Sequence, residues 1–226
     1  GIKGVLALMD EDRVSAVPGN RRDEHLGRMI YLLGRLGSGT TLEVSAVLAY
    51  ARGPHCYNAR CALGRLYRSA PAADRERILE ALRSGRDASS AARSGTVHAY
   101  CAMQLRQEEP LPAGDVQWLC SLVDAKQVYW EPRVRALDVL EKLDLAPSRG
   151  SVLAAAQDNV QRYQEPIRCR AIIFLVHSVK AGRYAVDQEV FDMLKRCQVD
   201  EDDNVRGNAN WALSELGALD SGSSKG

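Results

Sequence analysis

The chain has 226 residues, of which 46% are apolar and 26% charged, and its formal net charge at pH 7 is +1. This composition is ordinary for a folded globular protein and unlike that of a disordered chain. The near-neutral charge gives no overall sign of a protein dedicated to nucleic acid or acidic membranes. No apolar run approaches the roughly 18 residues that a membrane-spanning helix needs, so we expect no membrane contact.

Six cysteines lie in mostly apolar stretches without any CxxC pair, at positions 56, 61, 101, 120, 169 and 197. They are typical of small core residues in a reducing compartment, and we therefore expect an intracellular protein. The sequence starts GIKGVL without Met, and we expect it to be a piece of a longer chain. The last residues, 218–226, are typical of a flexible tail.

The N-terminal region, residues 1–54, predicts helices that cap a repeat array or form divergent repeats. Residues 24–36 place apolar side chains along one helical face, and Gly37 then ends the helix. Thr41 is a candidate N-cap for a helix reaching Tyr50. The sequence leaves open whether residues 2–17 form a capping helix or a half-repeat.

Residues 55–217 predict a repeated pair of helices. Helical segments with similar patterns begin at Tyr57, Gly95, Glu131, Glu165 and Asp202. A basic residue near each start is separated from the next by 38, 37, 33 and 38 positions; these residues are Arg60, His98, Arg135, Arg168 and Arg206. The other helix of each pair is predicted between these segments, at 74–82, 115–123, 151–160 and 186–196. No segment has the alternation typical of strands, so the fold class is all-α.

The segment from Asp202 resembles the second helix of HEAT repeats, whose form is D-x-x-V-R-x-x-A-x-x-A-L-x-x-L-G. The matching residues are Asp202, Val205, Arg206, Ala209, Ala212, Leu213, Leu216 and Gly217. Weaker copies begin at Glu165 and Glu131. The resemblance implies a right-handed α-α superhelix of about five to six HEAT-like helix pairs. The Trp211 segment is also similar to armadillo repeats, but Glu215 stands where their ligand-binding Asn is expected.

The regularly spaced arginines have two interpretations. HEAT repeats commonly pair this Arg with a nearby acidic residue, which implies Glu131, Glu165, Asp202 or Asp203 as partners. A stack of repeats would also place basic residues along one edge, as a stripe for phosphates. Arg133 and Arg170 are not required by the repeat and keep this second interpretation open.

Other candidate contacts are aromatic and amide side chains. Tyr129 and Trp130 precede a Glu-Pro turn, where solenoid loops present variable contacts. Trp211 is expected in the core, because apolar residues recur at its equivalent positions. The repeat does not require Asn208 or Asn210, so we also treat them as candidates for partner binding.

Catalytic and metal-binding patterns are weak. His55 and Cys56 with Cys61 form an incomplete set of zinc ligands. The sequence contains no G-x-S-x-G, HExxH or Gly-rich phosphate loop. We therefore expect no enzyme, no metal site and no cofactor.

Two functions remain. The favoured one is a non-catalytic scaffold or adaptor that binds a protein partner or peptide segment through its concave surface or inter-helix loops. The alternative is a nucleic-acid-binding HEAT protein, similar to the HEAT-type alkylpurine DNA glycosylases. Trp118 with Asp124, or Trp130 with Glu131, is a poor match to the carboxylate and aromatic groups which that resemblance requires.

Overall fold

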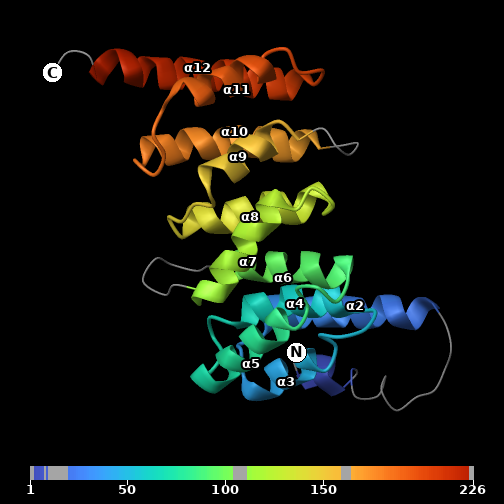
Figure 1. Ribbon diagram of the computed structural model, residues 1–226. Coiled ribbons are helices and arrows are strands. Elements are labelled where there is room, and N and C mark those ends of the chain that lie inside the picture. Colours follow the sequence, from blue (N-terminus) through green and yellow to red (C-terminus); the bar gives the residue numbers. More distant parts are fainter. Residues whose placement is uncertain (1–2, 8, 10–19, 104–110, 159–163, 224–226) are drawn as a thin grey trace. The chain divides into compact units, whose positions relative to one another are not determined.

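The computed structural model describes residues 3–7, 9, 20–103, 111–158 and 164–223, with only the backbone of 20–24 and 218–223 (Figure 1). Within these ranges the chain consists of helices joined by turns, and no strand occurs. Contacts divide the chain into two compact units, residues 1–105 and 106–226. The expected all-α class is therefore confirmed. Most of the segment 2–17 lies outside the described residues.

The first unit contains two layers of helices. Helices α2 (Asn20–Leu36), α4 (Cys56–Leu66) and α6 (Ser90–Ala102) lie side by side, with α4 in contact with both neighbours (Figure 1). Helices α3 (Thr41–Leu48) and α5 (Ala72–Arg83) form the other layer and contact α4.

Small residues set the close spacing of α2, α4 and α6. A Cβ on Gly34 of α2 would lie 2.6 Å from Ala62 Cα of α4. A Cβ on Gly64 of α4 would lie 2.5 Å from Ala99 Cα of α6. Since real Cβ atoms do not approach backbone so closely, the two glycines allow the helix axes to come together.

The second unit repeats this arrangement. Helices α8 (Trp130–Lys142), α10 (Glu165–Lys180) and α12 (Asp203–Ser223) form one layer, in which α10 contacts α8 and α12 (Figure 1). Helices α7 (Ala113–Asp124), α9 (Arg149–Ala156) and α11 (Gln188–Cys197) form the other, with α9 contacting α7 and α11. Each connection is short, as expected for helix pairs.

Helix starts agree with capping chemistry, with one correction. The N-cap of α3 is Thr40 and not Thr41: its hydroxyl accepts from Glu43 N, and the Glu43 carboxylate accepts from Thr40 N. This reciprocal pair satisfies two helix-end donors. Ser148 caps α9 by accepting from Ser151 N, and Asp187 caps α11 by accepting from Val190 N.

Four apolar positions of the HEAT-like segment that starts at Asp202 lie in the core of the second unit. Val205, Ala209, Ala212 and Leu216 are all completely buried. Helix α12 continues to Ser223, so its last residues overlap the predicted tail. The boundaries of the three predicted regions stay a prediction.

Candidate interaction surface

The repeat has a buried basic position in the second unit, and it differs from the position predicted from sequence. Arg133 is 1% exposed and donates from Nη1 to Asp158 Oδ2 at 2.7 Å. Its Nε and Nη2 donate to Val123 O at 3.3 and 3.0 Å. Arg135 instead lies on the surface, 3.4 Å from Asp138. Arg133 therefore belongs to the interior, where it cannot form part of a surface stripe.

This correction makes the repeat more regular. Arg133, Arg168 and Arg206 each precede a fully buried alanine by three positions, at 136, 171 and 209. In α6 the same position holds Thr96, three residues before the buried Ala99, and not His98. The spacings from Arg60 onward become 36, 37, 35 and 38 residues, in place of 38, 37, 33 and 38.

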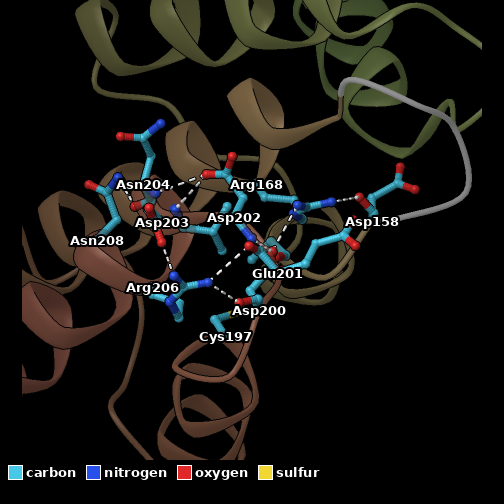
Figure 2. A network of polar contacts seen from close by, with 12 residues as sticks. Asp158, Arg168, Cys197, Asp200, Glu201, Asp202, Asp203, Asn204, Arg206 and Asn208 are labelled. Atoms are coloured by element: carbon cyan, nitrogen blue, oxygen red, sulfur yellow. Dashed lines mark hydrogen bonds and ion pairs between the residues drawn. The ribbon is translucent and has the colours of Figure 1, made fainter.

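Aspartates and turn carbonyls hold the next two arginines (Figure 2). Arg168 donates to Asp158 O at 3.3 Å and to Asp200 Oδ1 at 2.9 Å. Arg206 donates to Asp200 O at 2.6 Å and forms an ion pair with Asp203. Asp203 is one of the acidic partners implied by the HEAT resemblance, whereas Asp200 is not. Arg168 therefore connects two successive turns, whereas Arg206 holds the turn before its own helix, so both have a structural role.

A second polar network lies on the surface of α8, α10 and α12. We call it the inter-helix ladder and define it as Asp138, Glu141, Arg170, His177, Lys180, Trp211 and Glu215. Arg170 joins α10 to α8, donating from Nε to Asp138 Oδ1 at 2.8 Å and from Nη2 to Glu141 Oε2 at 2.5 Å. His177 Nδ1 donates to Glu141 Oε1 at 2.6 Å.

The ladder continues from α10 to α12. The His177 and Trp211 rings meet edge to face, with centroids 6.3 Å apart, and Lys180 forms an ion pair with Glu215. Trp211 is only partly buried, so the expectation that it fills the core is wrong. Its ring packs against His177 on this surface.

Glu141 is the carboxylate of the ladder that binds two side chains of α10. Partial burial raises the pKa of Glu141, but hydrogen bonds from His177 and Arg170 and the charge of Arg170 hold it below its usual range. Glu141 is therefore ionised at neutral pH, where it pairs with Arg170 and accepts a hydrogen bond from His177. Because Arg170 has carboxylates at two of its nitrogens, it is not a free cation on the surface.

Asn208 belongs to the ladder side of α12, whereas Asn210 does not. Asn208 Nδ2 donates to Asn204 O at 2.8 Å and its side chain also hydrogen-bonds the Cys169 thiol of α10. Burial raises the pKa of that thiol, although the Asn208 bond lowers it. Asn210 accepts from Gln198 Nε2 at 2.6 Å and so faces the end of α11.

The two candidate aromatics lie at the start of α8. Tyr129 is its N-cap residue and is 55% exposed, while Trp130 is the first helical residue and is partly buried. Their ring centroids are 5.3 Å apart with an interplanar angle of 44°. They form a partly exposed aromatic pair, which we call the α8 aromatic pair.

Sequence analysis missed most residues of the ladder. Once buried Ala136, Ala171 and Ala209 are aligned, Arg135, Arg170 and Asn208 occupy one equivalent position. The repeat therefore puts variable polar side chains at a fixed surface position, and the alanines were the signal that could have located it.

Within the described parts of the chain, no three His, Cys, Asp or Glu side chains are close enough to hold a metal ion. The same parts contain no helix with both the length and the apolarity to cross a bilayer. None of the six cysteines, all of which lie in the described residues, is in a disulfide, and Cys56, Cys61 and Cys197 are buried.

Comparison with solved structures supports the repeat fold. The chain is similar to a designed armadillo repeat protein, with 15% identity and a TM-score of 0.53 over 96% of this chain and 100% of the other. It is also similar to an engineered protein, with 14% identity and a TM-score of 0.54 over 96% of each chain. A scan of protein-family models and a search of curated proteins gave no match. The chain thus has a HEAT/armadillo-like helical repeat fold.

Proposed function

We propose that the chain is a non-catalytic scaffold that binds a protein partner through the second unit, using the α8 aromatic pair and the inter-helix ladder. The observation that carries the proposal is Tyr129, a large side chain that is 55% exposed beside Trp130. Tyr and Trp are the residue types that most often dominate binding energy at protein interfaces. Helical repeats stack such side chains into extended binding surfaces.

The ladder supplies the surrounding polar contacts. Ion pairs hold Arg170 and Lys180 in place, and a hydrogen bond to Glu141 holds His177, before any partner arrives. A partner that binds an ordered surface loses less side-chain entropy than one that must order it. Trp211 adds a second aromatic group to the same surface.

Nucleic-acid binding has less support. The two arginines that favoured a basic stripe are Arg133, which is buried, and Arg170, which is paired with two carboxylates. A protein that binds the phosphate backbone needs cations free to replace counterions. We also propose a reducing, intracellular environment, because the six cysteines lie in mostly apolar stretches and none is in a disulfide.

The proposal is tested with peptides selected from a random library on the immobilised protein. We expect selected peptides to bind the Tyr129→Ala variant at least about tenfold more weakly, the loss typical of an interface hot spot. Fluorescence polarisation with a labelled peptide measures the dissociation constant.

Val199→Ala is the matched control, because Val199 is an 83% exposed apolar residue in the turn before α12. Its dissociation constant should equal that of the unchanged protein. Peptides that bind the Tyr129→Ala and Trp211→Ala variants as tightly as the original would refute this binding surface. Retention on DNA that falls steeply with salt would favour the alternative.

A further inference from the structure

The first unit contains a buried arginine whose surroundings differ from those in the second unit. Arg60 is 1% exposed and donates to three backbone carbonyls and one hydroxyl: Ala81 O at 2.5 Å, Leu82 O at 3.1 Å, Ala51 O at 3.0 Å and Thr96 Oγ1 at 3.2 Å. No carboxylate of the described residues forms an ion pair with it. Arg133 and Arg168, at the equivalent position, each have an aspartate.

Part of the Arg60 guanidinium has no acceptor. Its Nε is buried and has no hydrogen-bond partner among the described residues. Burial lowers the pKa of Arg60, as does the nearby charge of Arg52, although the Cys56 thiol opposes them. Gly85 packs against the guanidinium so closely that a Cβ there would overlap it. The charge is thus held in place but not neutralised.

Arg60 lines a pocket of about 430 Å³ between the turn before α4 and the start of α6. The walls carry two cations, hydroxyls and small apolar groups, and no carboxylate; the lining residues are Ala51, Arg52, Gly53, Cys56, Arg60, Ser84, Ala88, Ser89 and Ala92. Arg52 is exposed and forms no ion pair with the described residues. The pocket is therefore electropositive.

The start of α6 borders the same pocket, at Ser89 and Ala92. Ser89 is its N-cap, and the Ser89 hydroxyl accepts from Ala92 N. The amides of Ser90 and Ala91, in the first turn, have no intrahelical acceptor. A helix N-terminus of this length carries a partial positive charge that favours anions.

We propose that this pocket binds an oxyanion, a carboxylate or phosphate group, which supplies the counter-charge that Arg60 lacks. The anion accepts hydrogen bonds from the first turn of α6 and pairs with Arg52 at the pocket mouth. The apolar walls at Ala88 and Ala92 accommodate the body of the molecule that carries it. This inference is independent of the proposed protein-binding surface, because it concerns the other unit.

The test uses the full chain and three probes at constant ionic strength: inorganic phosphate, acetate, and glutamate capped as its N-acetyl amide. Amide spectra of ¹⁵N-labelled protein should give saturable shifts for Ser90, Ala91 and the Arg60 Nε proton. The dissociation constant is expected on the order of 1 to 10 mM. Tightest binding of phosphate would indicate a phosphate-bearing ligand, and tighter binding of capped glutamate than of acetate an acidic peptide.

Two substitutions at Ser89 separate charge from capping. Asn, Asp and Ser are about equally good N-caps, so Ser89→Asp and Ser89→Asn should both fold. We expect the Asp variant to bind at least about tenfold more weakly, because its carboxylate already occupies the positive end of α6. The Asn variant should bind within about threefold of the original protein.

Arg52→Ala should weaken binding about tenfold, through loss of a charge-assisted hydrogen bond. Arg35→Ala removes the same charge from α2, outside the pocket, and should leave binding unchanged. Arg60 itself is not substituted, because it holds three carbonyls. Shifts that fail to saturate with all three probes, or equal binding by the Ser89→Asp variant, would overturn the proposal.

Discussion

The buried pair of Arg133 and Asp158 allows a quantitative prediction about how the repeats are held together. Both side chains are no more than 1% exposed, and Nη1 lies 2.7 Å from Oδ2. In Asp158→Asn the Arg133 charge would remain buried with only Val123 O and an amide oxygen as acceptors. Removing one partner of a buried pair costs about 3–5 kcal/mol.

The assay is urea unfolding followed by helical circular dichroism, together with thermal melting. For a chain of this size that loss corresponds to a fall in Tm of roughly 10 °C. Asp144→Asn is the control, since the Asp144 side chain is 58% exposed in its ion pair with Arg183 and a solvent-exposed charge contributes only about 0–1 kcal/mol through such a pair. A cost below about 1 kcal/mol for Asp158→Asn would refute the argument that this pair anchors α8.

Three further predictions concern other parts of the fold. The folded pKa of Glu141 lies below its ordinary value of 4.5, so the stability that Glu141 contributes is complete above pH 4.5 and is lost as the pH falls through the folded pKa. In Glu141→Gln the free energy of unfolding, measured by urea titration, should therefore fall less steeply with acid. An unchanged dependence on pH would contradict this prediction. Burial raises the pKa of Cys197 to about 11, so at pH 8 its alkylation by iodoacetamide should be roughly 100-fold slower than that of an exposed thiol, as mass spectrometry would measure. Gly64→Ala should cost about 1–3 kcal/mol in urea unfolding, because its methyl group would meet the backbone of Ala99; a neutral change would show that α4 and α6 can move apart.

The helical repeat could be predicted from sequence because its signal lies in the spacing of apolar and small residues. Val205, Ala209 and Ala212 follow the period of a helix, and all three are buried as that period requires. A single sequence nevertheless left the register uncertain by two residues. Arg133 and Arg135 flank one position of the same helix, and only packing determines which of them turns inward.

The surface sites were less predictable, because partners of each side chain come from other helices. Arg170 has its carboxylates about 30 residues away in the chain, at Asp138 and Glu141. Asn208 and Asn210 are two residues apart, and a helix turns about 200° over that interval. They therefore face α10 and α11 respectively, which sequence proximity does not reveal.

The repeat position that holds Arg60, Arg133 and Arg168 thus has different surroundings in the two units. In the second unit, Asp158 and Asp200 neutralise the arginines at 133 and 168, and each aspartate comes from a turn between helices. In the first unit, the corresponding turn before α6 places Gly85 against Arg60. Carbonyls at the end of α5 accept hydrogen bonds from Arg60 but do not cancel its charge. A buried cation without a counter-ion is costly. The first unit therefore gains stability from any anion that reaches Arg60, whereas the second unit already contains its own.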